Sequence, residues 1–249
     1  MSNKEAIEKA NQIDEKIIFT LESGKNFRVE AGAGSGKTYS LLKVIEWLEK
    51  NKWANFKNKY QNVACLTYTN AAVDVIASRL KANSFIIPCT IHSFAWEAIK
   101  QYQKFLIDYM KDKNNEIANN EIKEVRYTLG SRYIEDKILY LFHNDVIDLF
   151  LALLDQDKFR RIFAAKYPII LIDEYQDSFK TIIDKFKNYF ISLGKLPQFG
   201  FFGDSWQTIY KTNKAVGKIE NENIFDINKI VNFRSCPEII KCLNKIRQD

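Results

Sequence analysis

The chain has 249 residues, of which 46% are hydrophobic and 27% charged, so it can bury a large core and has the composition of an ordinary globular protein. Its formal net charge of +6 permits an anionic partner without requiring one, because the lysines are scattered rather than clustered. The sequence has no Cys-x-x-Cys pair, which argues against a zinc site. It also has no long apolar segment and no N-terminal secretory pattern, which argues against a membrane-spanning or secreted protein. We therefore expect a cytoplasmic protein with reduced cysteines.

The first predicted elements are a helix, a short strand and a second helix. The first helix covers residues 5–22, with apolar residues at helical spacing, and Gly24 ends it. An apolar strand over residues 27–30 follows, and the helical spacing of apolar residues resumes from Leu41 to Leu48. Between this strand and the second helix lies a glycine-rich stretch, Ala31-Gly32-Ala33-Gly34-Ser35-Gly36-Lys37-Thr38.

A strand, a tight glycine-rich loop and a helix form the pattern of a phosphate-binding loop. Glycines let backbone N–H groups turn inward around a phosphate, and the N-terminus of the following helix adds partial positive charge. Lys37 can reach the β- and γ-phosphates of a nucleotide, and Thr38 can hold Mg²⁺. The strict pattern opens with glycine, whereas this chain has Ala31 there and a glycine one residue later, so the match is to a variant.

The middle of the chain alternates strands with helices and then changes character. Residues 51–60 are expected to form an exposed connection, and strands are predicted at 63–66 and 85–88. From about residue 95 to residue 160 the pattern becomes helical and charged, with a possible hairpin between Glu124 and Phe142 around Gly130. This region is the best candidate for an inserted subdomain.

Two adjacent acidic residues follow a buried strand in the second half of the chain. Residues 169–172 are four apolar residues in a row, which is typical of a parallel strand buried on both faces. Asp173 comes at the carboxyl end of this strand, where ligands bind in open α/β sheets. We expect Asp173 to hold Mg²⁺ and Glu174 to activate the attacking water, because phosphoryl transfer needs both a metal ligand and a base.

Two further polar stretches close the chain. A helix with apolar residues from Phe179 to Phe190 precedes a strand at 198–202, which leads into Gly203-Asp204-Ser205-Trp206-Gln207-Thr208-Ile209-Tyr210. Near the end, Asn232-Phe233-Arg234-Ser235 precedes a last helix that opens on a capping box.

Six stretches occur in the order found in UvrD/Rep-type superfamily 1 DNA helicases, and the chain resembles the first half of that family. They are similar to its motifs I, Ia, Ib, II, III and IV and lie at residues 31–38, 67–72, 90–94, 173–177, 203–210 and 232–235. The Asp-Glu-x-Gln-Asp and Gly-Asp-x-x-Gln-x-Ile-Tyr strings are specific, and the first disfavours a plain nucleotide kinase. The motifs extend over nearly the whole chain.

The resemblance assigns roles at the nucleotide. Gln207 would sense the γ-phosphate, and Arg234 would contact it where charge develops in the transition state. Gln12 would be the upstream adenine-reading glutamine, although its surroundings match the family poorly and a solvated helix residue is the alternative. The implied nucleotide-binding set is Gly32, Ala33, Gly34, Ser35, Gly36, Lys37, Thr38 and Gln12, with Lys37, Asp173, Glu174, Gln207 and Arg234 as the catalytic set.

The resemblance also implies contacts to single-stranded DNA. Tyr68 stands where the family carries a base-stacking aromatic, and such stacking contributes about 1–3 kcal/mol per base. Thr90, His92 and Tyr210 fall in stretches that face the DNA strand in the family. Core packing or local hydrogen bonding is the alternative role for these four residues.

The implied fold class is α/β: a RecA-like domain of the P-loop NTPase class, with a parallel central sheet flanked by helices, plus a largely helical inserted subdomain. Residues 1–95 and 160–249 would form the ATP-binding domain and residues 96–159 the insertion.

The sequence differs from the family pattern in two ways, so both a helicase and a subunit without unwinding activity stay possible functions. After Tyr210 the family continues with an aromatic, an arginine and a glycine, whereas here Lys211 is followed by Thr212, Asn213 and Lys214. Motifs V and VI, and the second RecA-like domain that carries them, have no counterpart among these 249 residues.

The first expected function is an ATP-dependent DNA helicase or translocase, present as its N-terminal ATP-binding part and weak as an ATP hydrolase by itself. The alternative is a helicase-derived nucleotide-sensing subunit that binds DNA or a nuclease without unwinding. Both would use ATP, Mg²⁺ and single-stranded DNA, with a nuclease, another protein subunit or a C-terminal second RecA-like domain as partner, and no membrane. Similar proteins act in DNA repair, in recombination and in bacterial anti-phage defence.

Overall fold

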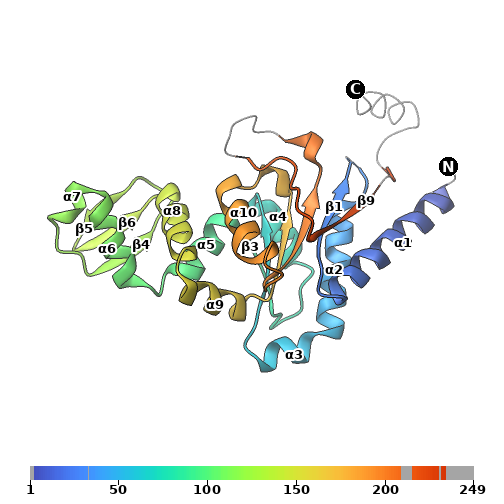
Figure 1. Ribbon diagram of the computed structural model, residues 1–249, viewed down its shortest axis with the longest axis horizontal. Coiled ribbons are helices and arrows are strands. Elements are labelled where there is room, and N and C mark those ends of the chain that lie inside the picture. The colour runs from blue at the N-terminus through green and yellow to red at the C-terminus, as the bar shows by residue number, and fades with distance from the viewer. Residues whose placement is uncertain (1–2, 33, 209–214, 230, 234–249) are drawn as a thin grey trace. The chain divides into compact units, whose positions relative to one another are not determined.

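The computed structural model of the chain describes residues 3–32, 34–208, 215–229 and 231–233 (Figure 1). The chain divides into two compact units, of which the first comprises Met1–Pro88 and Ala165–Asp249 and the second comprises Cys89–Ala164. Of the predicted site residues, Ala33, Tyr210 and Arg234 lie outside the described part, as does the helix expected after Ser235.

A six-stranded sheet organises the first unit, and its strand order is β3-β2-β7-β8-β1-β9. The pairs β1–β8, β1–β9, β2–β7 and β7–β8 are all parallel. Since β7 lies inside the sheet and shares it with β1, the predicted single α/β core is confirmed. The strands are β1 (Asn26–Ala31), β2 (Val63–Thr67), β3 (Ile86–Thr90), β7 (Ile169–Asp173), β8 (Gln198–Gly203) and β9 (Ile224–Lys229).

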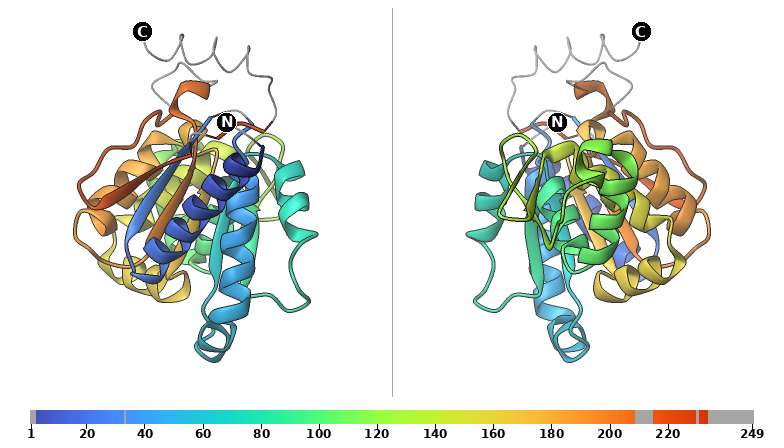
Figure 2. Two further views of the ribbon diagram at one scale, coloured as in Figure 1. Left: turned by 90° about the vertical axis from the view of Figure 1, so that its right-hand side faces the viewer. Right: turned by 90° about the vertical axis from the view of Figure 1, so that its left-hand side faces the viewer.

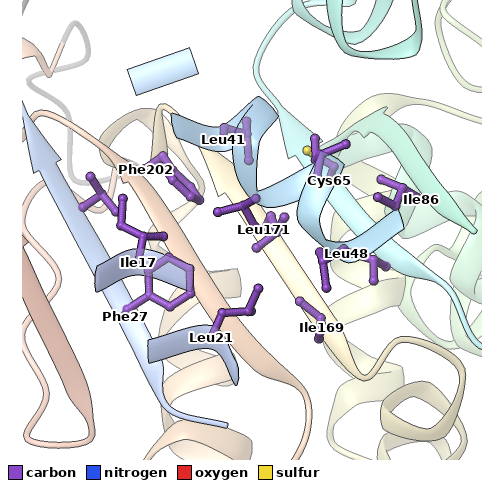
Figure 3. Close-up of a cluster of buried hydrophobic side chains, with 14 of the residues drawn as sticks. Ile17, Leu21, Phe27, Leu41, Leu48, Cys65, Ile86, Ile169, Leu171 and Phe202 are labelled. Atoms are coloured by element: carbon purple, nitrogen blue, oxygen red, sulfur yellow. The ribbon is translucent and has the colours of Figure 1, made fainter. Parts of the chain in front are cut away.

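Helices α1 (Asn3–Glu22) and α2 (Lys37–Asn51) lie side by side and cover one face of this sheet (Figures 1 and 2). Their apolar stripes pack on alternate strand residues such as Phe27, Leu171 and Phe202 in one buried cluster (Figure 3). Helix α4 (Asn70–Ala77) follows β2. Phe199 and Phe201 point to the opposite face because side chains alternate along a strand. There Phe199 meets Phe186 and Phe190 of α10 (Lys180–Phe186) and the π-helical turn η2 (Lys187–Ile191).

The prediction of an exposed connection over residues 51–60 was wrong. Helix α3 (Trp53–Asn58) forms there, and Phe56 is buried with its ring stacked 4.9 Å from that of Phe85. The surrounding lysines and asparagines hide this contact in the sequence, because only one apolar side of a six-residue helix needs to face the core.

The second unit combines helices with a small three-stranded sheet of order β4-β6-β5. Its helices are α5 (Ile91–Ile99), α6 (Gln103–Lys113), α7 (Asn115–Ala118), α8 (His143–Leu154) and α9 (Asp157–Lys166), the last of which runs into the first unit. Its strands are β4 (Glu124–Tyr127), β5 (Tyr133–Glu135) and β6 (Ile138–Leu141). The assignment of residues 96–159 as an inserted subdomain stays a prediction.

The expected hairpin exists, but its turn was placed too early. Strands β5 and β6 are antiparallel and join through Asp136 and Lys137, both with positive φ, whereas β4 pairs with β6 in parallel. A turn without glycine gave no local signal, so Gly130 was the stronger but misleading marker.

No helix in the described ranges is long and apolar enough to cross a membrane.

Candidate active site

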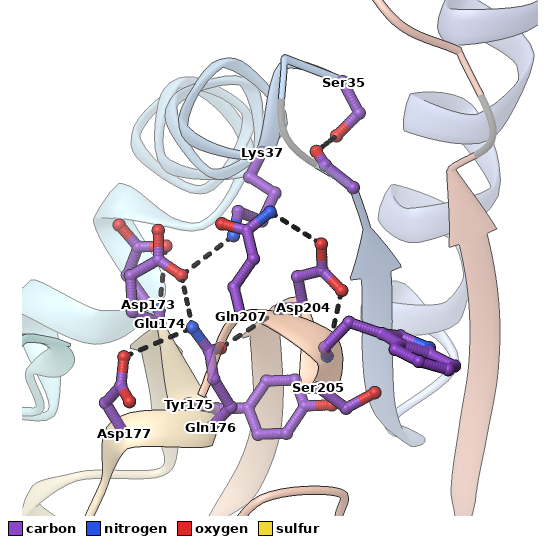
Figure 4. Close-up of polar contacts among 12 residues, drawn as sticks. Ser35, Lys37, Asp173, Glu174, Tyr175, Gln176, Asp177, Asp204, Ser205 and Gln207 are labelled. Atoms are coloured by element: carbon purple, nitrogen blue, oxygen red, sulfur yellow. Dashed lines mark hydrogen bonds and ion pairs between the residues drawn. The ribbon is translucent and has the colours of Figure 1, made fainter. Parts of the chain in front are cut away.

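The carboxyl ends of three adjacent strands bring the predicted catalytic residues together. The glycine-rich loop follows β1, Asp173 and Glu174 close β7, and Asp204 and Gln207 follow β8 (Figure 4). Parallel strands that are neighbours in a sheet end at the same edge, so residues far apart in the chain meet there.

The glycine-rich loop is held in its turn by its own backbone and by Ser35. The Ser35 hydroxyl and N–H both donate to the Gly32 carbonyl, at 2.7 Å and 3.2 Å. Gly36 caps α2 with φ 80° and ψ 38°, a left-handed conformation that glycine adopts without strain. Because α2 begins at Lys37, the unpaired N–H groups of its first turn face the end of the loop, which is the arrangement that binds phosphate.

Lys37 and Glu174 form an ion pair at the centre of the site. The Lys37 ammonium lies 2.8 Å from Glu174 Oε2, and the Gln176 amide donates to the same oxygen at 2.8 Å. Glu174 has φ 47°, a left-handed backbone that is uncommon for a residue with a side chain and is typical of functional sites. The Glu174 carboxylate is therefore paired with the Lys37 ammonium group, which a nucleotide phosphate would need to bind.

Asp173 is a buried carboxylate beside this ion pair. Burial and the negative charge of Glu174 raise the pKa of Asp173 to about 6, although Lys37 and a 3.1 Å hydrogen bond from the Glu174 N–H act against the rise. A carboxylate that is destabilised in this way gains from a cation. Thr38 is exposed at the start of α2. One carboxylate and one hydroxyl suit Mg²⁺, which is bound by few protein ligands together with phosphates and water. Among the described residues no cluster of three or more metal-ligating side chains occurs.

A chain of hydrogen bonds continues from Glu174 to Gln207. Gln176 accepts a hydrogen bond from the Asp204 N–H at 3.1 Å, and the Gln207 amide donates to Asp204 Oδ2 at 2.7 Å. Gly203 makes this approach possible, because a Cβ there would lie 2.3 Å from Gln176 Oε1. Three residues, Glu174, Gln176 and Asp204, thus connect Lys37 with Gln207, the predicted γ-phosphate sensor.

Glu30 connects the strand before the glycine-rich loop to the two acidic stretches, and the sequence analysis assigned it no role. Its carboxylate accepts a hydrogen bond from the Tyr175 hydroxyl at 2.6 Å, and from both the N–H and the hydroxyl of Ser205 at 2.6 Å. Burial would raise the pKa of Glu30, but these hydrogen bonds lower it overall. The available signal was an acidic residue, together with Arg28, in a strand that is buried over most of its length.

The other predicted residues lie apart from this network. Gln12 is exposed on α1, and Tyr68 is 46% exposed after β2. In the second unit, Thr90 caps α5 by accepting the Ser93 N–H at 3.3 Å. The His92 ring lies 4.6 Å from that of His143 and is tilted against it, and burial and that second imidazole lower the pKa of His92. A DNA-contacting role for Tyr68, Thr90 and His92 stays a prediction.

The chain is similar to known families and proteins over most of its length. A family profile described as an AAA domain matches residues 14–213. Gabija protein GajB from Bacillus cereus strain VD045 is 31% identical over 92% of this chain, and its counterpart from strain HuB5-5 is 23% identical over 94%. The mitochondrial ATP-dependent DNA helicase HMI1 of Saccharomyces cerevisiae is 24% identical over 90% of the chain.

The matched proteins are longer than this chain. It spans 48% of either GajB sequence and 38% of HMI1. Among solved structures, the Pif1 helicase from Candida albicans aligns with 99% of this chain and 44% of its own, with 16% sequence identity and a TM-score of 0.49.

Proposed function

The chain belongs to the AAA-domain family whose profile covers residues 14–213, and we propose that it is the ATP-binding half of a superfamily 1 DNA helicase or translocase. The observation that carries the proposal is the convergence of Lys37, Asp173 and Glu174 at the ends of two strands of one sheet, next to a glycine-rich loop.

Each of these side chains has a distinct role in ATP hydrolysis. Lys37 and the N–H groups at the start of α2 bind the β- and γ-phosphates. Thr38 and Asp173 hold Mg²⁺, which neutralises charge on the phosphates when it is bound. Glu174 accepts a proton from the attacking water.

The Lys37–Glu174 ion pair suggests how nucleotide binding prepares the base. A phosphate that binds Lys37 competes with the Glu174 carboxylate for the same ammonium group, which lies 2.8 Å away. Once released, the carboxylate remains tethered by Gln176 and becomes available to water. Gln176 and Asp204 link Glu174 to Gln207 by hydrogen bonds. A movement of Glu174 on nucleotide binding would therefore shift Gln207.

Nucleotide titrations of two variants test the site. We expect Lys37→Ala to lose ATP binding, and Glu174→Gln to retain binding but lose hydrolysis, since glutamine cannot accept the proton. Lys50→Ala, an exposed lysine on the same helix, is the matched control and should behave like the unmodified chain. Unchanged ATP affinity in Lys37→Ala would show that the loop is not the nucleotide site.

A second candidate function is favoured by two observations. The similarity to GajB covers most of this chain, and Lys211-Thr212-Asn213-Lys214 replaces the aromatic and arginine that the resembled helicases carry after Tyr210. The chain would then sense nucleotide and bind DNA or a nuclease subunit without unwinding. ATP-dependent capture of a nuclease, with no strand separation in its presence, would select this function over the first.

A further inference from the structure

A cluster of charged and polar side chains, all of them buried except the partly exposed Lys43, lies beneath the glycine-rich loop. It comprises Asp14 of α1, Ser40 and Lys43 of α2 and Lys229 at the end of β9, and we call it the loop cluster. Lys229 Nζ donates to Asp14 Oδ1 at 3.0 Å and to Ser40 Oγ at 2.6 Å, and the Ser40 hydroxyl donates to Asp14 Oδ1 at 2.5 Å. Lys43 Nζ lies 3.0 Å from the other Asp14 oxygen.

The loop cluster is in contact with the predicted phosphate-binding turn. A Cβ placed on Gly36 would lie 3.9 Å from Lys229 Nζ, so the ammonium group lies directly against this glycine. Ser40, which accepts from Lys229, also donates its own N–H to the Gly36 carbonyl at 3.0 Å. Lys229 therefore supports both the last glycine of the loop and the first turn of α2.

The chain that follows β9 makes a second contact with the same loop. The Phe233 N–H donates to the Gly34 carbonyl at 2.8 Å. Since Lys229 and Phe233 stand four residues apart in the chain, one short segment holds the loop at Gly36 and at Gly34. Arg234 is the next residue in the sequence and lies outside the described residues.

The charges of the loop cluster do not cancel. Burial would raise the pKa of Asp14, but hydrogen bonds from Ser40, Lys229 and Lys43 lower it overall, so the carboxylate is ionised at neutral pH. Two ammonium groups then share one carboxylate, which leaves an excess of one positive charge below the loop. A buried ion pair is costly to desolvate and is often less stable than an apolar packing of similar size, so stability alone is a weak reason for placing Lys229 there.

We propose that Lys229 is a positioning residue of the nucleotide site, which holds the glycine-rich loop in its phosphate-binding shape and adds positive charge beneath it. This inference rests on the proposed ATP-binding function of the loop. It assigns to β9 a part in phosphate binding, in addition to its place at the edge of the sheet. Lys37 approaches the phosphates from α2, whereas Lys229 acts from the other side of Gly36.

A double-mutant cycle separates this role from simple stabilisation. Lys229→Met leaves the buried Asp14 carboxylate with only the partly exposed Lys43 as its cation, and Asp14→Asn leaves the buried Lys229 ammonium without a carboxylate, so each should lower the unfolding temperature. In the double variant both charged groups are gone, so much of the stability should return. ATP affinity should follow a different order: on the order of tenfold weaker in Lys229→Met and in the double variant, which both lack the ammonium group beneath the loop, and less affected in Asp14→Asn, which keeps it. Lys229→Arg should retain part of the affinity.

The measurements are ATP and ADP titrations and thermal unfolding of the unmodified chain, the four variants and Lys25→Met, an exposed lysine that serves as the control. A double variant that regains stability and binds ATP as tightly as the unmodified chain would overturn the proposal, because the ion pair would then be structural. Lys37→Ala is measured alongside: if it abolishes binding while the double variant does not, the role of Lys229 fails and the ATP site stands. If the unmodified chain binds no ATP, both proposals fail.

Discussion

Asp173 combines deep burial with a negative neighbour, and both oppose its ionised form. Its pKa of about 6 means that most molecules carry the carboxylate at pH 7, whereas about one in ten does at pH 5. A proton and Mg²⁺ compete for the same oxygens, so we expect the gain in ATP affinity that Mg²⁺ provides to fall by about tenfold per pH unit below pH 6.

The experiment compares ATP titrations with Mg²⁺ and with a chelator across pH 5–8, so that titration of the nucleotide itself is common to both series. Asp173→Asn should remove the pH dependence of the Mg²⁺ gain together with most of the gain. An equal Mg²⁺ gain at pH 5 and pH 7 in the unmodified chain would exclude Asp173 as the metal ligand.

Tyr68 presents its ring to solvent directly after β2, with 46% of the residue exposed. An aromatic face in this position suits stacking on a nucleic-acid base, which tolerates any sequence. We expect Tyr68→Ala to weaken binding of single-stranded DNA by about 1–3 kcal/mol, while Tyr68→Phe keeps it. Fluorescence anisotropy across a salt series measures this, since phosphate contacts weaken with salt in both variants and stacking does not. Equal affinities for Tyr68→Ala and the unmodified chain at every salt concentration would assign Tyr68 to packing alone.

At the scale of elements, the Glu30 carboxylate connects the end of β1 by hydrogen bonds to the turns that follow β7 and β8. Three hydrogen bonds to one carboxylate, from Tyr175 and twice from Ser205, make this junction sensitive to the loss of charge. We expect Glu30→Gln to lower the free energy of unfolding by about 2 kcal/mol at pH 7, because hydrogen bonds to charged groups contribute about 1.5–3 kcal/mol.

The pH dependence of this loss identifies its source. The pKa of Glu30 is below its ordinary value in the folded state, so its stabilisation is present above the ordinary glutamate pKa and is lost as pH falls through the folded one. Urea denaturation should therefore show the difference between the unmodified chain and Glu30→Gln shrinking toward acid pH. Glu46→Gln, an exposed glutamate on α2, is the control. A difference that persists unchanged in acid would assign the effect to packing.

Some elements and contacts could be predicted from the residues next to them in the sequence, and others could not. Five of the six strands of the central sheet were predictable from short apolar runs, and β7, which ends at Asp173, is the clearest case. Strand β9 was not predicted, because its sequence mixes apolar with polar residues. The contacts of Glu30 and Lys229 were not, because Glu30 and Ser205 stand 175 residues apart and Asp14 and Lys229 stand 215 apart. Nothing within ten residues of Lys229 indicates a buried partner, and only the position of β9 beside β1 brings α1 and Lys229 together. Helix α3 was missed for a different reason, since its buried residue Phe56 is surrounded by polar residues in the sequence.

At the scale of the whole molecule, the described site would form one wall of the proposed ATP-binding cleft. Lys37, Asp173, Glu174 and Gln207 all belong to the first unit, and so does the segment that leads to Arg234. This chain spans 48% or less of the matched GajB and helicase sequences. In the resembled family, residues from two domains contact the γ-phosphate, and the site residues of the first unit would supply the contacts of one of them.

We therefore expect residues 1–249 alone to hydrolyse ATP slowly and not to unwind DNA. An arginine supplied from a second domain or another chain can raise phosphoryl-transfer rates by roughly 10³–10⁵-fold, so most of that factor should be missing. Translocation needs a grip that changes between two domains as ATP is bound and released, and one ATP-binding domain has no partner to close against. Steady-state ATPase with saturating single-stranded DNA, measured before and after adding a C-terminal half or a partner chain, tests this. Glu174→Gln supplies the background rate. Rapid DNA-stimulated turnover by the isolated monomer would contradict the prediction, and would mean that a group within this chain, or a second copy of it, completes the cleft.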